Sequence, residues 1–451
     1  MKKTDWKKAL KDDIYSCNPP TPKRKNIKGY RYLYPINLKS NLKEIEVNPP
    51  KIIGFSMIRL EYILHLILSH KQKKDRHSYS ILNMEYLRKV VPQANDYIKF
   101  LGNKGFIEWK NYSKGRNSRL YRLVEESKVK FKTITDPAFI KRIEKAHTQI
   151  KRRNSRKYPH LNKWIKKTEI DFEKALSTIR KEYQNRKKEN KESAERSYSY
   201  CLGQILRIQQ KEIYISVNDT NNRLDSNFTN LPSILLKHLE IDGKKFIEMD
   251  IKNSQPFFVL ALLNPSSEAI KVISDFDKSL LEIVNQYKIN DYVDTIRYLR
   301  YVCKGNFYDL MARKFNKLGI NCSNRNDLKS NIFIVFFGKP NAHNFNDGAR
   351  IFKIMFPTVY SLFKRIKAKG NNRLAILLQR LEAHSVLEIA VKRITNEFPD
   401  LPILTRHDSI LIAKDYNPDK KVQKRVQSIL RNSVKDVVGF YPPGRVRNVN
   451  K

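Results

Sequence analysis

Apolar and polar residues alternate along the chain in two different periods. Residues 54–71 (GFSMIRLEYILHLILSHK), 78–91 (SYSILNMEYLRKVV) and 92–105 (PQANDYIKFLGNKG) repeat apolar side chains at the three- to four-residue spacing of a helix. Residues 106–126 (FIEWKNYSKGRNSRLYRLVEE) instead alternate apolar and polar side chains around the polar stretch SKGRNS, which is typical of a β-hairpin. The pattern therefore predicts three helices followed by a hairpin.

Three helices closed by a basic hairpin resemble a winged-helix domain, here over residues 51–127. The resemblance implies that a helix from about Ala94 to Asn103 is presented to a DNA groove. It also implies that three cations of the hairpin lie near phosphates, namely Lys114, Arg116 and Arg119. Any other small α+β domain would show the same pattern, so that alternative stays open.

The flanking segments differ in composition from this domain. Residues 1–50 are polar and proline-rich, as in CNPPTPKRKN and VNPP, and we expect a largely irregular, basic arm. Residues 128–215 are strongly basic but keep a helical spacing of apolar residues, which predicts packed helices with basic solvent-facing sides. Asp171 and Glu173 form a D-x-E pattern there, but their lysine-rich, helical surroundings argue against a proofreading exonuclease site.

Two aspartates stand where predicted core strands end. KKFIEMDI (residues 244–251) alternates its side chains as a strand does, and it ends next to Asp250. ILTRHDSILIA (residues 403–413) has the pattern of a buried hairpin with Asp408 at its turn. A turn aspartate is either hydrogen-bonded to nearby amides or a metal ligand. As a pair, Asp250 and Asp408 would supply the carboxylates that two-metal phosphoryl transfer requires.

A helix is expected directly after the first of these strands. NSQPFFVLALLN (residues 253–264) carries Pro256 in what would be the first turn, with Asn253 or Ser254 as the N-cap. A strand that ends in an aspartate and turns at once into a helix is well placed to hold a divalent cation. Mg²⁺ takes hard oxygen ligands and keeps several waters, so two carboxylates and substrate phosphates suffice.

A third segment, SNRNDLKSNIFIVFFGKPN, has the residues to bind a triphosphate. Arg325, Lys329, Phe333 and Phe337 recur every fourth residue, so on a helix they lie along one slowly drifting face. Cations at one end of this face would bind phosphates, and the aromatic rings would contact a base or sugar. Gly338 is expected to end the helix.

Charge points to a polyanionic partner. The chain has 451 residues, with 89 Lys plus Arg against 45 Asp plus Glu, which gives a net charge of +44. Nucleic acid is the usual partner of such a chain, although a base-composition bias toward lysine, asparagine and isoleucine would raise the same count. No apolar run is long enough to span a membrane. Four scattered cysteines without a C-x-x-C pair favour a reducing, cytoplasmic location, in a bacterial or phage-infected cell.

These segments together resemble the family A DNA polymerases, the bacterial polymerase I class, and more distantly the single-subunit RNA polymerases of phages and mitochondria. TNNRLDSNFTNLP (residues 220–232) is similar to the family's minor-groove segment, which implies contacts to primer and template from Arg223 and Asn230. Asp250 matches the family's motif A aspartate, and Asp408 matches that of motif C, with His407 before it. The resemblance covers about residues 200–440.

The fingers motif is also similar, because Arg325, Lys329 and Phe333 follow the family's R-x3-K-x3-F-x3-Y spacing. Phe337 stands where the family has tyrosine. Gln255 stands where a glutamate helps to exclude ribose, and the motif C triplet is His-Asp-Ser. These departures leave the choice between deoxyribose and ribose open. The predicted helix over residues 377–390 would bring Gln379 near the primer terminus or template, as would Arg373 before it, unless both are packed polar edges.

We therefore expect an α+β fold: a right-hand polymerase with an antiparallel palm sheet, helical fingers at about 265–370 and a short helical thumb, after the winged-helix-like domain. Residues 128–215 would be the linker and thumb, and 216–451 the palm and fingers.

The resemblance implies a DNA-directed DNA polymerase without proofreading that replicates a plasmid, phage or mobile element. Its substrates would be nucleoside triphosphates on a DNA primer–template, with two Mg²⁺ or Mn²⁺ ions, and Asp250, Asp408 and Lys329 would be catalytic. The alternatives are a primase or RNA polymerase, which would bind RNA, and a non-catalytic initiator or defence protein.

Overall fold

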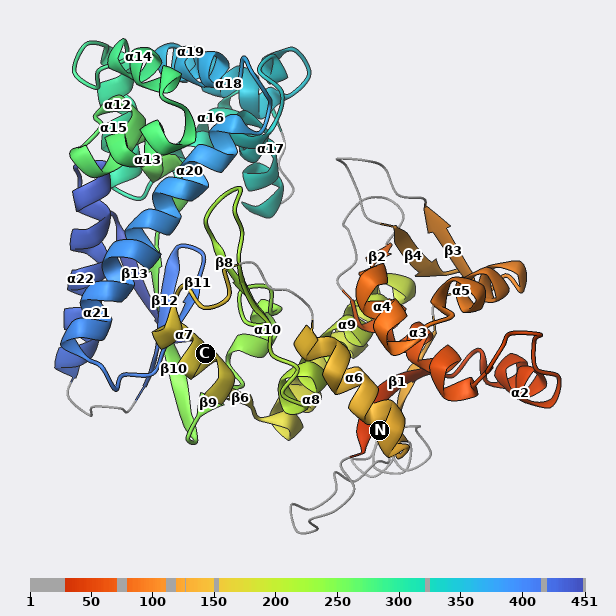
Figure 1. Cartoon of the computed structure of the whole chain (residues 1–451). Coiled ribbons are helices and arrows are strands. Elements are labelled where there is room, and N and C mark those ends of the chain that lie inside the picture. The colour runs from red at the N-terminus through yellow and green to blue at the C-terminus, as the bar shows by residue number, and fades with distance from the viewer. Residues whose placement is uncertain are drawn as a thin grey trace, which may run out of the picture. The chain divides into compact units, whose positions relative to one another are not determined.

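The structure is a computed structural model in which residues 29–70, 79–110, 119–125, 127–149, 154–320, 325–414 and 420–448 are described (Figure 1). Helices and strands are mixed, and the chain divides into two compact units. The first unit consists of the residues up to 151 together with 169–213 and 231–239. The second consists of 152–168, 214–230 and 240–451. These units divide the chain differently from the expected boundaries after residues 127 and 215.

The N-terminal arm is not irregular over its described part. Strand β1 (Tyr30–Pro35) pairs antiparallel with β5 (Val129–Ile134), with Leu33 opposite Phe131, and helix α2 (Lys39–Val47) follows β1. The expectation of an irregular segment was wrong here because the strand YRYLYP finds its partner about a hundred residues later in the chain. Pairing at such a distance leaves no local pattern to recognise.

The predicted helices and hairpin of the first unit are present. The elements run in the order α3, β2, α4, α5, β3 and β4, and the three strands form an antiparallel sheet in the order β2-β4-β3. Helix α5 buries Tyr97, Ile98 and Leu101 on one face and leaves Lys99 exposed on the other. The bounds are α3 (Met57–Ser69), β2 (Ser80–Ile81), α4 (Met84–Val90), α5 (Ala94–Asn103), β3 (Ile107–Lys110) and β4 (Leu120–Leu123).

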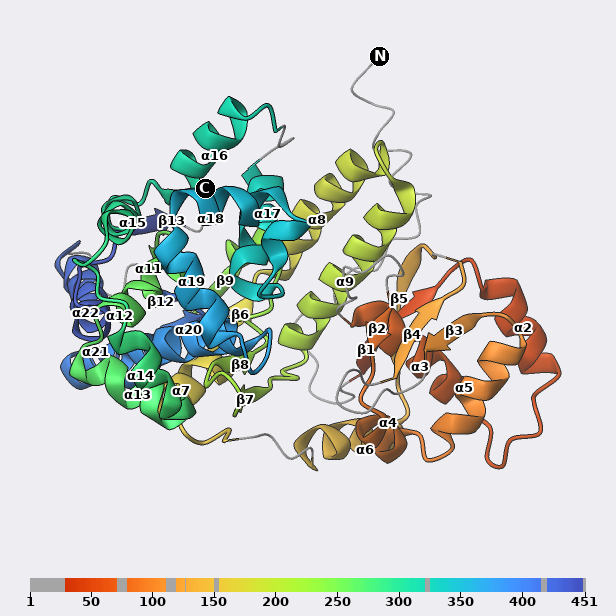
Figure 2. The same cartoon turned by 90° about the horizontal axis from the view of Figure 1, so that it is seen from above.

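The basic segment contributes mainly helices, as its pattern predicts. Helices α8 (Phe172–Lys187) and α9 (Lys191–Gln209) run side by side as a hairpin (Figures 1 and 2), and the rings of Tyr183 and Tyr198 lie 5.1 Å apart between them. Asp171 caps α8 by accepting a hydrogen bond from the backbone N–H of Lys174. The first unit also contains α6 (Pro137–Gln149), β6 (Glu169–Ile170) and α10 (Ser233–Leu236).

Helix α9 packs against α3 without space for a side chain at Gly203. A Cβ atom added there would lie 2.5 Å from Cβ of Ser69 and 2.8 Å from its Cα. Glycine therefore permits the two helices to approach backbone to backbone.

The second unit is organised around strand β10 (Lys244–Ile251). It pairs antiparallel with β12 (Ser409–Ala413) along one edge and with β13 (Gly444–Asn448) along the other, while its first residues pair with the end of β9 (Leu239–Ile241). Strand β11 (Ile403–Arg406) pairs with β12 through a two-residue turn. This is the strand and hairpin that the sequence predicts. Strands β7 (Ile215–Val217) and β8 (Leu224–Ser226) form a separate hairpin.

Between residues 254 and 383 the chain forms a helical region next to this sheet. A cluster of buried aromatic rings forms the core of that region, in which Phe352 contacts Phe307, Phe336 and Phe356. The helices are α11 (Ser254–Phe258), α12 (Leu260–Leu263), α13 (Ser267–Asp277), α14 (Ser279–Asn285), α15 (Val293–Cys303), α16 (Phe307–Lys317), α17 (Arg325–Phe337), α18 (Asp347–Met355), α19 (Pro357–Ile366) and α20 (Arg373–Ala383). A 3-10 turn, η1 (Ala342–Asn344), precedes α18.

Helix α20 continues into a π-helix, η2 (His384–Ala390), and then into α21 (Val391–Glu397). A π-helical turn changes which residues face a given side, and such turns recur at functional sites. The unit is completed by α7 (Pro159–Lys167) and α22 (Lys420–Val438). No single helix of the described residues meets the length and composition of a membrane span, although one bent pair, Ser254–Leu263 with Ser267–Asp277, does so by those two criteria.

A buried lysine closes the C-terminal end of α17. Lys367 is 3% exposed, and its Nζ donates hydrogen bonds to the carbonyl oxygens of Val335 at 2.6 Å and Gly338 at 3.0 Å. Burial lowers the pKa of Lys367 to about 8. The last carbonyls of a helix have no partner within the helix, and this side chain satisfies two of them at the end of α17.

Candidate active site

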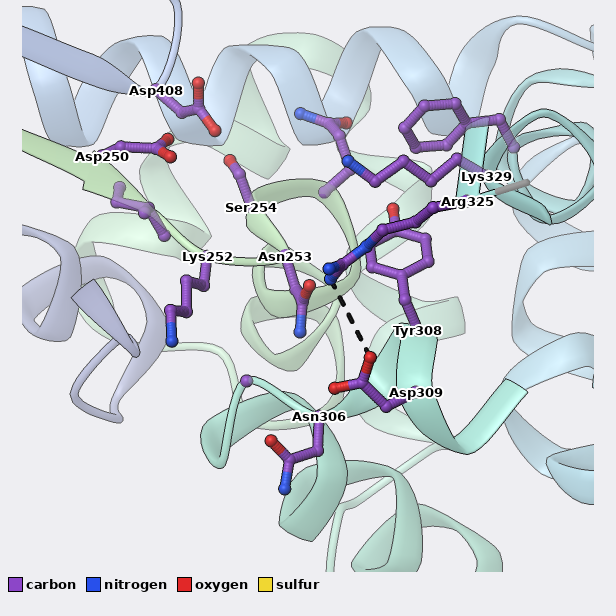
Figure 3. Close-up of a pocket in the computed structure, with 14 residues that line it drawn as sticks. Asp250, Lys252, Asn253, Ser254, Asn306, Tyr308, Asp309, Arg325, Lys329 and Asp408 are labelled. Atoms are coloured by element: carbon purple, nitrogen blue, oxygen red, sulfur yellow. Dashed lines mark ion pairs between the residues drawn. The ribbon is translucent and has the colours of Figure 1, made fainter. Parts of the chain in front are cut away.

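Two carboxylates converge at the edge where β10 ends. Asp250 lies opposite Ser409 in the antiparallel register, and Asp408 directly precedes Ser409 in the β11–β12 turn. His407 occupies the left-handed region at φ 55°, which closes the turn in two residues. Figure 3 shows the carboxylates of Asp250 and Asp408 side by side. The structure thus brings together the two aspartates that the sequence singled out, from segments more than 150 residues apart.

At Asp408, burial and neighbouring negative charges outweigh the smaller stabilising effect of the Arg223 cation on the carboxylate. Burial raises the pKa of Asp408 well above its usual range, and the negative charges of Glu382 and Asp250 raise it further. Crowded carboxylates of this kind disfavour a second or third negative charge unless a cation neutralises them.

A cavity of about 660 Å³ extends from these aspartates to helix α17 (Figure 3). Arg325, Lys329 and Phe333 line it, as predicted from their four-residue spacing, and Gln255 lines it from the start of α11. The other lining residues are Ile251, Lys252, Asn253, Ser254, Gly305, Asn306, Tyr308 and Asp309. The paired carboxylates of Asp250 and Asp408 thus lie at one end of the cavity and the side chains of α17 at the other, where Arg325 also forms an ion pair of 3.9 Å with Asp309 (Figure 3).

Tyr308 also lines this cavity and was not predicted. Burial raises the pKa of its hydroxyl well above the usual value, and the negative charge of Asp408 adds to this effect. The hydroxyl therefore stays neutral and able to donate a hydrogen bond. Lys329 lies over the Tyr308 ring at 5.4 Å from its centroid, and the Phe333 ring meets it edge-on at 6.4 Å. The Tyr308 ring thus contacts both of these α17 side chains.

The helix cap expected after β10 is formed differently. Asn253 does occupy the N-cap position of α11, but it is left-handed at φ 55° and its side chain makes no capping hydrogen bond. The Nδ2 atom of Asn253 and the Oε1 atom of Gln255 are both buried, and within the described residues neither has a hydrogen-bond partner. The cavity thus presents one unused donor and one unused acceptor, which a polar ligand could satisfy.

A buried glutamate that the sequence interpretation missed, Glu382, lies beside the cavity. It is 1% exposed and accepts hydrogen bonds from Arg223 Nη2 at 2.6 Å, Ser254 Oγ at 3.0 Å and Gln255 Nε2 at 2.7 Å. Helical spacing could have indicated it, because Glu382 lies three residues after Gln379 and hence on the same face of α20. A second buried glutamate, Glu248, accepts a hydrogen bond from Ser409 Oγ at 2.8 Å.

The remaining predicted residues lie around the cavity rather than in it. Phe337 is 38% exposed and does not line the cavity, but its ring contacts that of Phe333 at 5.5 Å. His407 is also outside the lining. Asn230 donates to the Tyr214 hydroxyl at 3.3 Å, and Gln379 accepts from Asn221 Nδ2 at 3.0 Å.

Arg373 and the hairpin cations were predicted to bind nucleic acid, and Arg373 does not line the cavity. Arg373 forms an ion pair with Asp277 and lies over the Phe276 ring at 5.1 Å, so it is a packed polar edge of α20. Lys114 and Arg116 lie outside the described residues. Arg119 is described, just before β4, where its guanidinium lowers the pKa of Tyr121 against a larger effect of burial.

The donor atoms present fit a hard divalent cation. Carboxylate oxygens are what Mg²⁺ and Mn²⁺ prefer, and the mutual repulsion around Asp408 is the electrostatic condition that such a cation relieves. Within the described residues no group of three or more His, Cys, Asp or Glu side chains is arranged to hold a metal ion. Asp250 and Asp408 are the side chains that could hold one, together with water and substrate oxygens.

Comparison with known proteins gives limited similarity. No family model matches the sequence, and no curated protein matches it. Among solved structures, the chain is similar to the POL domain of Pol1 from M. smegmatis in complex with DNA primer-template and dNTP. The two are 11% identical, the match covers 58% of this chain and 54% of that chain, and the TM-score is 0.29. The chain thus matches about half the length of that polymerase domain.

Proposed function

We propose that the protein is a template-directed nucleotidyltransferase whose active centre is the cavity between Asp250 and α17. One observation carries this proposal: a single cavity has paired carboxylates at one end and Arg325, Lys329 and Phe333 at the other. Nucleotidyl transfer needs this combination, because the reacting phosphate must be bound between groups that bind a metal and groups that bind a polyphosphate.

Each cavity residue has a role in this proposal. Arg325 and Lys329 bind the triphosphate of the incoming nucleotide through charge-assisted hydrogen bonds, and Phe333 contacts its base. Gln255 contacts the sugar. Arg223 and Asn230 face primer and template, although Arg223 is engaged by Glu382. The primer 3′-hydroxyl gives its proton to water and its oxygen forms a bond to the α-phosphorus. The bond from that phosphorus to the oxygen bridging to the β-phosphate breaks, and pyrophosphate leaves with that oxygen.

Asp250 and Asp408 would hold two Mg²⁺ ions, or Mn²⁺ in their place. When bound, the metal lowers the pKa of the attacking hydroxyl and neutralises the charge on the leaving pyrophosphate. The side chains contribute the fixed geometry: β10 and the β11–β12 turn hold the two carboxylates in place through five antiparallel residue pairs of β10 with β12. Such pre-organisation is the main contribution a protein makes to phosphoryl transfer.

The rest of the chain completes a DNA polymerase in this proposal. Residues 240–451 with 214–230 form palm and fingers, the α8–α9 hairpin is the thumb, and the helices and hairpin of residues 51–127 act as a winged helix that delivers the enzyme to a plasmid, phage or mobile-element DNA in the cytoplasm. The net charge of +44 supports a nucleic-acid partner. We infer modest fidelity, because Asp171, the first residue of the D-x-E pattern, caps a helix.

A primase or RNA polymerase is the second candidate. The unused acceptor of Gln255 favours it, because a deoxyribose offers no 2′-hydroxyl to that atom. A non-catalytic DNA-binding protein would keep the charge and the first unit but would have no use for the carboxylate pair.

Primer extension on a recessed DNA template tests the proposal. Deoxyribonucleotides and ribonucleotides are supplied separately with Mg²⁺ to the natural protein and to Asp250→Ala, Asp408→Ala and Asp436→Ala. Asp436 is the matched control, because it is exposed and pairs with Arg393 away from the cavity. We expect template-matched extension that Asp436→Ala retains and the other two variants lose. Extension that survives at either cavity aspartate would refute the assignment, and DNA binding without any extension would support the non-catalytic alternative.

A further inference from the structure

The Gln255 side chain is held in one orientation by Glu382. Its Nε2 donates a hydrogen bond of 2.7 Å to Glu382 Oε2, which also accepts from Ser254 Oγ at 3.0 Å. The other oxygen of the same carboxylate accepts from the guanidinium of Arg223 at 2.6 Å. Three donors from two segments of the chain, Arg223 after the β7–β8 turn and the first two residues of α11, thus fix one carboxylate that is 1% exposed.

This arrangement decides which end of the amide is available to a ligand. An ionised carboxylate has acceptors only, so it can pair with the NH₂ end of a glutamine and not with the carbonyl end. The Arg223–Glu382 ion pair provides the cation that an ionised carboxylate needs. The amide oxygen is therefore left over, and Gln255 Oε1 is indeed buried and lacks a partner within the described residues. A buried acceptor without a donor costs about 1–3 kcal/mol, which a ligand donor would recover.

We propose that Glu382 is a positioning residue that sets the sugar selectivity of the cavity. By holding the Nε2 end of Gln255, it leaves Oε1 to accept a hydrogen bond from the 2′-hydroxyl of a bound ribonucleoside triphosphate. The inference rests on the proposed nucleotidyltransferase function, and of its two candidates it favours the primase or RNA polymerase over the DNA polymerase. A site with a dedicated acceptor rejects a ligand that lacks the matching hydroxyl, since the acceptor then stays unpaired.

Replacement of Glu382 by glutamine removes this bias. A glutamine at 382 can either donate or accept, so the Gln255 amide is free to turn and to present its NH₂ end instead. Gln255→Leu removes the acceptor altogether while Glu382 remains. Glu388→Gln is the matched control: Glu388 is also on the α20–α21 segment and accepts from Tyr158 at 2.6 Å, but it does not line the cavity.

The experiment has two readouts on each full-length protein. The first is the ratio of kcat/KM for ATP to that for dATP in templated primer extension, measured on one preparation so that any loss of folded protein cancels. The second is equilibrium binding of ATP, dATP and 2′,3′-dideoxy-ATP without a primer. The dideoxy compound separates the two hydroxyls, because it differs from dATP only at the 3′ position.

We expect the natural protein to use and bind ATP at least as well as dATP. The ratio should fall about tenfold in Gln255→Leu and in Glu382→Gln, and it should stay within about twofold in Glu388→Gln. A ratio that is the same in Glu382→Gln as in the natural protein overturns the positioning role. A strong preference for dATP in the natural protein overturns the sugar assignment. The assignment is also overturned if binding weakens from dATP to 2′,3′-dideoxy-ATP but not from ATP to dATP, because the 3′-hydroxyl would then be the group recognised.

Failure of the proposed function gives a different result. If no nucleotide is incorporated but ATP still binds more tightly than dATP, and Glu382→Gln abolishes the difference, the cavity is a ribonucleotide site without transferase activity. If neither nucleotide binds, both the function and the sugar assignment are refuted.

Discussion

Replacement of Lys367 by methionine should change how the stability of the protein depends on pH. The Lys367 pKa falls from a usual value of 10.5 to about 8 because the side chain is buried. The difference of about 2.5 (10.5 − 8) corresponds to about 3 kcal/mol, at about 1.4 kcal/mol per unit of pKa. This is the free energy by which burial disfavours the charged amine in the folded protein.

The direction in which the free energy of unfolding changes with pH follows from proton binding. Below about pH 8 the amine is charged in both the folded and unfolded states, so the full cost of burying the charge applies. Between about pH 8 and pH 10.5 only the unfolded state keeps the proton, and the free energy of unfolding therefore rises with pH. Above that range both states are neutral and the cost is gone. The neutral amine still donates to the carbonyl oxygens of Val335 and Gly338.

Urea denaturation of the natural protein and of Lys367→Met at about pH 7 and about pH 9.5 measures this effect. The difference in free energy of unfolding should shift in favour of the natural protein by about 2 kcal/mol between the two values. Groups shared by both proteins cancel in this comparison. Lys364→Met, which removes an exposed lysine of α19, reports the effect of net charge alone. Parallel pH dependence of the natural protein and Lys367→Met would refute the reasoning.

Three further substitutions have outcomes that the structure fixes. Asp408→Asn should raise the free energy of unfolding by about 1 kcal/mol in metal-free buffer while it abolishes transfer, because it removes a charge that Glu382 and Asp250 repel; lower stability in thermal melting would contradict this. Gly203→Ala should cost about 2 kcal/mol by urea denaturation, since the new Cβ would lie 2.5 Å from Ser69; stabilisation, as expected in a free helix, would show that the helices are not in contact. Lys329→Met should raise the KM for nucleoside triphosphates about tenfold with a smaller change in kcat, measured by steady-state extension; an unchanged KM would exclude a phosphate contact.

Local sequence patterns predicted the parts of the site that lie on single elements. Alternation in KKFIEMDI placed Asp250 at the end of a strand, and β10 covers the predicted residues, 244–251. The four-residue spacing placed Arg325, Lys329 and Phe333 on one helix, and they line one cavity. The predicted bounds of α5 also match. In each case the periodicity of one element decides which side chains share a face.

What the sequence did not predict depends on contacts between distant segments. Glu382 is joined to Arg223 and Gln255 by hydrogen bonds that span 159 and 127 residues. Tyr308 enters the cavity because its ring packs under Lys329, and nothing in its own neighbourhood indicates this. Arg373 was assigned to nucleic acid as a cation just before the predicted helix, with a packed polar edge as the alternative, and Asp277 on α13 pairs with it. Such partners become visible only when the chain is folded.

The division of the chain between the two units affects how the protein folds during synthesis and how it can evolve. The boundaries fall after residues 151, 168, 213, 230 and 239, so the backbone passes from one unit to the other five times. On the ribosome, the first unit cannot be completed until the stretch ending at Leu239 has emerged, by which point more than half of the protein has been made. A single crossover in the gene cannot exchange either unit as one contiguous cassette. The two units should therefore have been inherited together and diverged at a common pace.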